Sequence, residues 1–296
     1  MSAVITVFTP SYNRKHTLHR CYESLLKQSN KSFIWMIIDD GSTDGTEELV
    51  RQWQMRDNGF EIQYVYKKNG GLHTGYNKAI ELCTTELMMC IDSDDYVAEE
   101  AIQTIISFWN AHGSDEYAGI VAPDKYENGE IIGDPLPDQK SVNLIDLMCG
   151  KYKINNGDRE NVVRTELYKS VAPMKSFGEE KNFNPHYMHL QISKKYDFLV
   201  LNEPLRVVQY QENGMTANIF RQYLNSPKSF AQSRRLYMTF ENTPLKFRIK
   251  TAIHYVSSCI IGKDMKSLFK INNKPLVFLS IPFGFLLSIY IRYKGK

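Results

Sequence analysis

Three carboxylates stand within four residues at the end of a short apolar run. The run covers residues 87–91, and Asp92, Asp94 and Asp95 follow it, with Ser93 between them. An apolar run this short, bounded by polar residues, predicts a buried strand. Like charges this close raise each other's pKa, so the cluster calls for a positive partner. Hard oxygen ligands suit Mg²⁺ or Mn²⁺, which commonly joins one or two carboxylates to substrate phosphates. The alternative is a solvated turn whose Asp side chains cap the next helix.

Three earlier apolar segments end in the same way. Residues 4–9, 33–38 and 61–66 are rich in β-branched and aromatic side chains, which predicts strands. Each is followed by a polar turn and then by apolar residues at helical spacing. Four such repeats predict an α/β domain with a parallel sheet and helices on both faces. Ligands of such sheets bind beyond the carboxyl ends of the strands, so the polar residues there should meet at one edge. These residues are Tyr12, Asp39, Asp40, Asn69 and the carboxylates of residues 92–95.

The whole chain has the composition of a globular protein. Its 296 residues, 43% hydrophobic and 23% charged, allow one large domain with a smaller appendage. The five cysteines are scattered and none form a C-x-x-C pair, which favours reduced thiols in a cytosolic protein. The sequence runs from Met1 into the first strand without a basic region, so we expect no secretory signal.

Four short motifs at the strand ends resemble those of a known family. They are Thr9-Pro-Ser-Tyr-Asn-Arg14, Ile38-Asp-Asp-Gly-Ser-Thr-Asp44, Asn69-Gly-Gly-Leu72 with Asn77, and Ile91-Asp-Ser-Asp-Asp95. Their order and spacing are similar to those of the family 2 glycosyltransferases, in particular the bacterial enzymes of capsule and exopolysaccharide synthesis. The resemblance is specific over residues 4–110, looser to about residue 220 and only general beyond. It implies the GT-A fold, in which a Rossmann-like, mostly parallel central sheet is flanked by helices.

The resemblance also implies a nucleotide diphosphate sugar as donor, with UDP as the favoured nucleotide. Tyr12 offers an aromatic face to the base, and Pro10 keeps its loop extended. An aspartate of the second motif accepts a hydrogen bond from the base, and we favour Asp40 over Asp39. The alternative for both is capping of the following helix. The other candidates for donor binding are Arg14, Asn69, Gly71, Asn77, Asp92 and Ser93.

The spacing Asp92-x-Asp94 matches the D-x-D motif of the family, which implies a divalent ion, Mn²⁺ or Mg²⁺. Asp92 would face the ribose, Asp94 would ligate the ion that bridges the two phosphates, and Asp95 would assist either role. The ion offsets charge that builds on the departing nucleoside diphosphate. Where the family often has Arg this chain has Tyr76, which leaves a phosphate contact open. The lysines 67–68 are the substitutes we consider, although a solvated strand end is the simpler interpretation.

An inverting transfer requires a general base that takes the proton from the acceptor hydroxyl. The family often supplies it as Glu-Asp ahead of a helix in the second half, and this chain departs from that pattern. Its candidates are Glu180, which we favour, and Glu179, both ahead of the amphipathic segment 187–196. His186 and His189 are the alternatives.

Charge divides the chain into two regions. Residues 1–214 carry 22 basic and 31 acidic side chains, a net of −9, whereas residues 215–296 carry 14 and 2, a net of +12. The basic region contains an apolar run of 16 residues, 276–291, which is shorter than the roughly 20 of a spanning helix. Basic flanks and Pro282 favour an interfacial anchor on an anionic membrane surface, and a core helix is the alternative. No recognition motif accompanies the charge, so we expect no nucleic acid partner.

We therefore predict a GT-A domain over residues 1–219, with a nucleotide-sugar half (1–111) and an acceptor half (112–219), and a basic, helical, membrane-associating region over 220–296. The predicted activity is metal-dependent, inverting transfer from a UDP-sugar to a glycan or lipid-linked acceptor of a surface polysaccharide. The predicted location is the cytoplasm, at the inner face of the cell membrane. The sugar, the linkage and the oligomeric state are not identified by the sequence.

Two rival functions remain open at this point. One is a non-catalytic subunit that binds nucleotide-sugars or serves in assembly, because the motif for the base is weak. The other is a sugar-phosphate nucleotidyltransferase, which is also an α/β protein with acidic metal ligands. The second rival requires a glycine-rich triphosphate loop near the N-terminus, and residues 9–16 contain no glycine.

Overall fold

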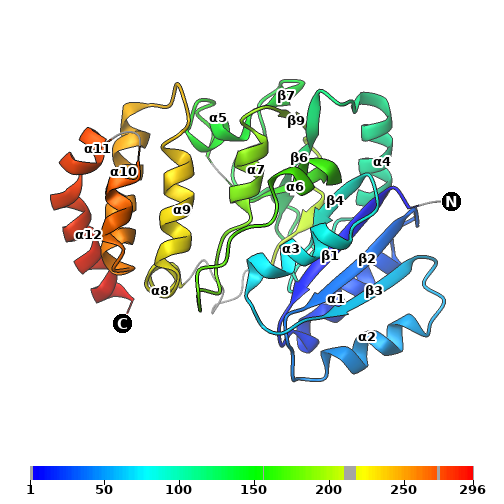
Figure 1. Ribbon diagram of the computed structural model, residues 1–296. Coiled ribbons are helices and arrows are strands. Elements are labelled where there is room, and N and C mark those ends of the chain that lie inside the picture. The colour runs from blue at the N-terminus through cyan, green and yellow to red at the C-terminus, as the bar shows by residue number, and fades with distance from the viewer. Residues whose placement is uncertain (1–2, 156, 210–217, 272–273, 296) are drawn as a thin grey trace. The chain divides into compact units, whose positions relative to one another are not determined.

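The computed structural model describes residues 3–155, 157–209, 218–271 and 274–295 (Figure 1). The chain forms two compact units. The sheet unit contains the chain up to Gly70, then Thr74–Pro173 and Met188–Gln209. The helical unit contains Gly71–His73, Met174–Tyr187 and the described chain from residue 218 onward. The stretches 71–73 and 174–187, which we predicted as parts of the first domain, therefore belong with the C-terminal helices.

Strands and helices alternate along the first half of the sheet unit, as the sequence repeats predict (Figure 1). Its strands are β1 (Ile5–Ser11), β2 (Phe33–Asp39), β3 (Glu61–Tyr66), β4 (Leu87–Cys90), β5 (Tyr96–Val97), β6 (Tyr117–Lys125), β7 (Ser141–Val142), β8 (Arg159–Arg164), β9 (Asp197–Val200) and β10 (Arg206–Val207). Its helices are α1 (Lys15–Leu26), α2 (Thr46–Gln54), α3 (Leu72–Leu82), α4 (Ala101–His112), α5 (Leu144–Met148), α6 (Thr165–Val171) and α7 (His186–Ile192). The first residues of α3 and α7 belong to the helical unit.

The sheet is parallel in its first half and mixed in its second. Its strand order is β3-β2-β1-β4-β8-β6-β10-β5, with β9 and β7 continuing from β6. β1 pairs in parallel with β2 and β4, and β2 pairs in parallel with β3. β8 lies between β4 and β6 and is antiparallel to both. The predicted sheet, mostly parallel, is thus confirmed, and its antiparallel pairs lie in the second half, where β8 enters between two parallel strands from the opposite end.

Successive residues of β1 support helices on opposite faces of the sheet. Ile5 and Val7 belong to the core that contains the apolar sides of α1, α2 and α4. Phe8 points the other way and packs edge-on against Tyr76 of α3, with 4.8 Å between ring centroids. Thr6 shares that direction, and its hydroxyl accepts from the thiol of Cys83 at 3.3 Å. Because strand side chains alternate in direction, one apolar strand buries two helix layers.

The second half of the sheet unit contains shorter elements than the first. Lys125 and Ile131 form an isolated bridge. β10 pairs through Arg206 and Val207 with β6 and β5. This short strand nevertheless fixes the position of Arg206 beside β6.

Helices make up the C-terminal part of the helical unit (Figure 1). They are α8 (Ile219–Asn225), α9 (Pro227–Tyr237), α10 (Leu245–Ile261), the 3₁₀ helix η1 (Met265–Phe269), α11 (Lys274–Leu279) and α12 (Ile281–Lys294). Their core includes Tyr255, Val256 and Cys259 of α10 with Leu268 and Val277. The Tyr255 hydroxyl donates to the carbonyl of Ser267 at 2.7 Å, which ties α10 to η1.

The apolar run that we expected to be an anchor is divided between α11 and α12. The buried residues of α12 are Gly284, Ser288 and Ile291, whose spacing places them on one side of the helix. Gly284 lies so close to α10 that an added Cβ would be 2.5 Å from a methyl carbon of Val256. Large apolar side chains of α12 are exposed instead, and we call them the α12 apolar surface: Phe283, Phe285, Leu286, Ile289, Tyr290 and Tyr293. Among the described helices, none combines the length and the apolarity that crossing a membrane requires.

Candidate functional site

The loops that follow β1 and β2 are joined by hydrogen bonds at the carboxyl edge of the sheet. The backbone N–H of Asn13 donates to the hydroxyl of Ser42 at 2.8 Å, and the side chain of Asn13 accepts from the N–H of Thr43 at 2.9 Å. The N–H of Lys15 donates to the carboxylate of Asp44 at 2.9 Å. Two loops about thirty residues apart in sequence therefore form one continuous wall.

Asp39 is buried and supports this wall from within. Its carboxylate accepts from the N–H of Ser42 at 2.7 Å and from the hydroxyl of Tyr64 at 2.5 Å. Burial, followed by this hydrogen bond, raises the pKa of Tyr64 well above its ordinary value. The bonds from Ser42 and Tyr64 occupy both oxygens of Asp39, so it supports the loop rather than the first turn of α2, which was the alternative. The carboxylate that bonds to the first turn of α2 is Asp44, which accepts from the N–H of Thr46 at 3.1 Å.

Asp40 is held beside the loop that follows β3. Its Oδ1 accepts from the N–H of Gly70 at 2.8 Å and from the ammonium of Lys67. Its carbonyl accepts from the side-chain amide of Asn69 at 2.8 Å. Lys67 also donates to the hydroxyl of Thr74 at 2.7 Å, so it is a paired residue rather than a solvated strand end.

The loop after β1 also reaches the carboxylates that follow β4. Arg14 Nη2 lies 4.0 Å from Asp94 Oδ2. The ring of Tyr12 in the same loop is 51% exposed, which leaves an aromatic face open to a ligand. The ends of β1, β2, β3 and β4 thus come together at one edge, as the topology predicts.

The other predicted donor-binding residues lie in different surroundings. Ser93 is buried, and Pro10 lies close to Gly75 of α3. Asn77 is half-buried on α3. Gly71 belongs to the helical unit, where its φ of +93° and its contact with the backbone of Lys181 require a glycine. The close backbone approach that we expected of Gly71 is therefore made to another segment of the chain.

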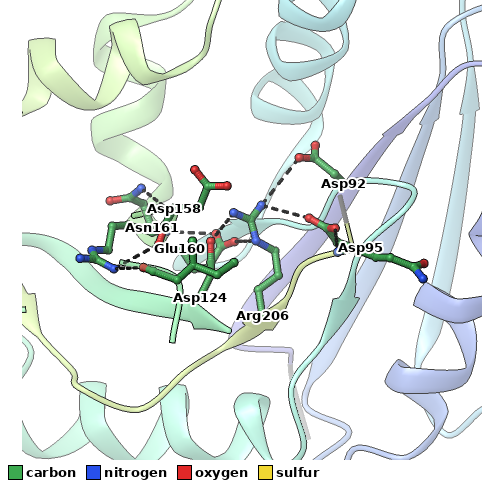
Figure 2. Close-up of polar contacts among 10 residues, drawn as sticks. Asp92, Asp95, Asp124, Asp158, Glu160, Asn161 and Arg206 are labelled. Carbon is green, nitrogen blue, oxygen red and sulfur yellow. Dashed lines mark hydrogen bonds and ion pairs between the residues drawn. The ribbon is translucent and has the colours of Figure 1, made fainter. Parts of the chain in front are cut away.

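Arg206 is the centre of an acidic cluster (Figure 2). Its Nη1 lies 3.7 Å from Asp92 Oδ2 and 3.7 Å from Asp95 Oδ2. Its Nη2 donates to Asp124, and its Nε lies 3.4 Å from Glu160 Oε2. Figure 2 shows Asp92 and Asp95 on one side of the guanidinium and Asp124 and Glu160 on the other. One arginine therefore connects the loop after β4 to strands β6 and β8.

The cluster is buried, and its charges depend on one another. The side chain of Arg206 is only 13% exposed. Burial raises the pKa of Asp95 to about 8, while Arg206 acts in the opposite direction. Burial also raises the pKa of Asp124 and Glu160, and Arg206 again opposes the shift. A guanidinium stays charged at any physiological pH. Arg206 is therefore a permanent positive partner for carboxylates that the sequence showed to need one.

Sequence analysis did not identify Arg206, Asp124 or Glu160 as parts of the site. Asp124 and Arg206 are 82 residues apart, and no spacing rule relates them. The sequence did contain one signal: Asp124, Glu160 and Arg206 each lie in or beside a short run of apolar residues. Charged side chains are seldom buried unless they are paired, so each of these residues required a partner. Which residues pair depends on the strand order, which the local pattern does not encode.

The carboxylates at this edge offer a partial ligand set for a divalent ion. Within the described ranges, no group of three or more His, Cys, Asp and Glu residues could hold a metal ion. Asp95 points inward, where its carboxylate accepts from the N–H of Gln209 at 3.1 Å and faces Arg206. The side chains of Asp92 and Asp94 are 44% and 23% exposed. One or two carboxylates with a substrate diphosphate is an ordinary ligand set for Mg²⁺ or Mn²⁺, so these residues fit an ion that is completed by substrate.

Glu180, our preferred general base, belongs to the helical unit, where its side chain lies against the first turn of α9. Its carboxylate accepts from the backbone N–H of Lys228 at 2.9 Å, the N–H of Ser229 at 2.8 Å and the Ser229 hydroxyl at 2.7 Å. It is 8% exposed, whereas Glu179 is exposed. These bonds satisfy the free N–H groups of the first helical turn, which is what a helix cap does.

The two histidines that we considered as alternative bases are partly or fully buried. His189 lies in the sheet unit, and its Nε2 is 2.6 Å from the hydroxyl of Tyr168. Burial lowers the pKa of His186 to about 4, so this imidazole is neutral near pH 7. Neither observation assigns a proton-transfer role to these rings.

Comparison with known proteins adds a family and a fold. The family model described as Glycosyl transferase family 2 matches residues 6–169. The chain is 35% identical to "Glycosyltransferase GlyG" of Streptococcus pneumoniae over 106 residues, 36% of this chain and 35% of that protein. It is 30% identical to "Putative teichuronic acid biosynthesis glycosyltransferase TuaG" of Bacillus subtilis over 105 residues, 36% of this chain and 41% of that protein. The chain thus spans less than half the length of either relative.

Solved structures resemble the chain over nearly its whole length. S. aureus TarS 1-349 in complex with UDP-GlcNAc has a TM-score of 0.61 at 17% identity, and the match covers 98% of this chain and 90% of that one. Mannosyltransferase PcManGT from Pyrobaculum calidifontis, in complex with GDP-Man and Mn²⁺, has a TM-score of 0.59 at 15% identity, over 100% and 84%. Identities this low establish the fold alone, and that fold is the predicted GT-A fold.

Proposed function

This chain belongs to glycosyl transferase family 2, and on that premise we propose that it transfers a sugar from a nucleotide diphosphate sugar to a glycan or lipid-linked acceptor. The observation that carries the proposal is the convergence of four loops on one edge of the sheet, where Arg14 reaches Asp94. That edge carries an exposed aromatic ring and acidic side chains, which suit a base and a metal-bound diphosphate.

We propose UDP as the nucleotide of the donor. The UDP-GlcNAc complex of TarS supports this choice, while the GDP-Man complex of PcManGT is the reason to test it. In this chain Tyr12 would stack on the base, and Asp40, kept in place by Gly70 and Lys67, would orient it. Asp39 has both its oxygens bound within the protein, which supports a structural role for it.

We propose Asp94 as the ligand of a Mn²⁺ or Mg²⁺ ion, with Asp92 beside it on the side of the ribose. When bound, the ion would offset the charge that builds on the departing nucleoside diphosphate. Asp95 would support the loop from behind through Arg206 and the N–H of Gln209. Arg206 would hold Asp92 and Asp95 in place and favour their ionised forms against the effect of burial, because it supplies a fixed positive charge on their inner side.

We propose an inverting transfer, in which the acceptor oxygen attacks the anomeric carbon and the bond to the diphosphate breaks. A general base takes the proton from the acceptor hydroxyl. The three hydrogen bonds on Glu180 support a capping role for that residue, so we move the proposed base to Glu179. Glu179 is exposed, and its carboxylate has no hydrogen bond or ion pair to any residue that the structure describes.

The donor proposal is tested with Asp94→Ala and a control, Asp138→Ala, an exposed aspartate outside the four motifs of the proposed donor site. UDP-, GDP- and dTDP-sugars are screened by thermal shift with and without Mn²⁺, and hydrolysis or transfer is then measured with the donor that binds. Both variants should fold, and only Asp94→Ala should lose metal-dependent turnover. Metal-dependent activity that survives in Asp94→Ala would contradict the metal assignment. Donor binding by the wild type with neither hydrolysis nor transfer would favour the non-catalytic subunit.

The base assignment is tested separately with Glu179→Gln. We expect this variant to lose turnover while its affinity for the nucleotide stays that of the wild type. Turnover that survives in Glu179→Gln would remove this residue from the mechanism.

We also propose that the helical unit holds the protein on the inner face of the cell membrane. The α12 apolar surface supports this, because its large side chains are exposed while the buried side of the helix carries Gly284 and Ser288. A patch of this kind on a soluble protein usually marks an interaction site. Lys and Arg residues of α10 and α12 would add attraction to anionic lipid.

The membrane proposal is tested by sedimentation with vesicles of phosphatidylcholine and phosphatidylserine. Phe283→Gln with Leu286→Gln should shift the protein toward the soluble fraction, and deletion of residues 275–296 should shift it further. Met55→Gln, at a residue that is 79% exposed in the sheet unit, is the control and should change nothing. Equal sedimentation of all variants would remove the anchor from the proposal.

A further inference from the structure

A depression of about 370 Å³ in the helical unit gathers positive charge. It lies among the segment 174–187, helix α9, and the turn between α10 and η1. Its lining includes the cations Lys175, Lys228, Arg235 and Lys263 and a single carboxylate, that of Asp264. The basic character that the sequence shows for this region is therefore concentrated around one hollow.

These cations differ from Arg206 in their surroundings, and the ammonium of Lys175 lies over the ring of Phe177, 5.2 Å from its centroid. None of Lys175, Lys228, Arg235 and Lys263 forms an ion pair within the part of the chain that the structure describes. Asp264 is engaged locally, where its carboxylate accepts from the hydroxyl of Ser267 at 2.6 Å. Like charges that converge on one hollow repel one another, and a bound anion would relieve that repulsion.

Local structure aims these side chains at the same place. Lys228 and Arg235 are seven residues apart on α9, which is two helical turns, so they share one side of the helix. Lys263 has a φ of +53°, a left-handed conformation that favours glycine. This conformation closes the C-terminal turn of α10, where the N–H of Asp264 donates to the carbonyl of Cys259 at 2.9 Å, and Lys263 thereby comes to line the depression.

We propose that this depression binds a phosphate or diphosphate group. Lysine ammonium groups bind phosphate as point charges, and an arginine presents a fork that matches two phosphate oxygens. A strand of nucleic acid would need an extended basic groove with stacking aromatics rather than a compact hollow. The site itself stands on the helical unit alone. Only its source rests on the proposed function, since a lipid-linked acceptor would bring such a group to the protein.

The first test is calorimetric titration with inorganic pyrophosphate, without divalent metal and in the Asp94→Ala background. Without a divalent ion the proposed donor site lacks the charge that would hold a diphosphate, and the varied residues lie in the helical unit, so the two proposals fail independently. Lys175→Gln with Lys228→Gln and Arg235→Gln should weaken binding about tenfold or more. The control, Arg248→Gln with Lys266→Gln and Lys270→Gln, removes the same charge from exposed positions outside the depression and should stay within about twofold.

A third variant gives a result that misfolding cannot imitate. Asp264→Asn removes the only carboxylate of the depression and should tighten pyrophosphate binding roughly threefold. Equal weakening by the two triple variants would show a general charge effect and overturn the site. So would the absence of pyrophosphate binding to the parent protein, or weaker binding by Asp264→Asn.

Vesicles then separate a lipid head group from a soluble phosphate. Binding is compared on phosphatidylcholine vesicles with phosphatidic acid, whose head group is a phosphate monoester, and on vesicles with phosphatidylserine. If the head group is the ligand, the triple variant of Lys175, Lys228 and Arg235 should lose the preference for phosphatidic acid. It should keep the binding that depends on Phe283 and Leu286. If the titration shows the site and the vesicles show no preference, the ligand is a soluble phosphate or diphosphate.

Discussion

The sheet unit buries charge, whereas the helical unit exposes apolar side chains. Arg206 is 13% exposed and has acidic partners on both sides, while Leu279 and Tyr293 are 75% and 74% exposed. Both arrangements depart from the usual distribution, in which charged side chains are exposed and large apolar side chains are buried. They differ in what offsets the cost in free energy. The buried charges are satisfied by one another within the unit, so changing them should affect folding. The exposed apolar residues are mostly open to solvent, although Tyr290 packs edge-on against Phe220, so changing them should affect binding more than folding.

The largest effect on the unfolding free energy is expected from Arg206→Met, which changes the buried charges of the sheet unit. Removal of the guanidinium leaves the buried Asp95, Asp124 and Glu160 without their positive partner, together with the partly exposed Asp92. Breaking a buried ion pair in this way costs roughly 3–5 kcal/mol of unfolding free energy. Urea denaturation measures the change, and Arg206→Lys, which keeps a positive charge, should lose less. A loss below about 1 kcal/mol would mean that the cluster is not held by charge.

A smaller loss is expected from Gly284→Ala, on the packed side of α12. The new methyl group would lie 2.5 Å from a side-chain carbon of Val256, which is fully buried and has no room to move aside. Overpacking of this kind costs roughly 1–3 kcal/mol. Thermal unfolding checks it. An unchanged melting temperature would show that α12 is not fixed against α10.

A third, comparable change tests the role of Glu180 in the helical unit. Glu180→Ala removes the acceptor for the first N–H groups of α9 and should cost about 1 kcal/mol, as loss of a helix cap does. Glu179→Ala is the matched control for stability, because its exposed carboxylate makes no such bonds, and it should be within about 0.5 kcal/mol of the wild type. Equal losses in the two variants would refute the capping role.

The smallest effect on stability is expected on the exposed side of α12. Leu286 is 62% exposed, so Leu286→Gln should leave the unfolding free energy within about 0.5 kcal/mol of the wild type. Denaturation in the absence of lipid measures this. A loss of 2 kcal/mol or more, as for a buried leucine, would place this side chain in a protein interface and would undo the contrast between the two units.

Much of the sheet unit is predictable from the sequence because its signals are local. The apolar runs that end near Thr9, Ile38, Tyr66 and Ile91 predicted the strands, and the structure has β1–β4 within two residues of each. Because parallel strands present their carboxyl ends at one edge, the loops that follow them were predicted to be neighbours. The second half of the sheet was harder to predict, because β8 is antiparallel and its position between β4 and β6 has no local signal.

Two of our interpretations changed because a side chain's role depends on its neighbours in space. Lys67 was interpreted most simply as part of a solvated strand end, yet its ammonium group pairs with Asp40 and with the hydroxyl of Thr74. Glu180 was favoured as a base from its place ahead of an amphipathic segment, yet its carboxylate bonds to α9, nearly fifty residues later. In neither case can the residue that bonds to the side chain be identified from the neighbouring sequence.

The sequence alone determined the kind of fold, the edge at which its acidic and aromatic loops meet, and the division into an acidic body and a basic tail. These follow from periodicity, strand ends and composition, all of which act within short stretches of chain. Tertiary structure decided which charges pair with Arg206, which carboxylate caps α9 and which side of α12 stays exposed. Those outcomes depend on which elements become neighbours, and free energy is gained there only when residues far apart in the chain are brought within a few ångströms of each other.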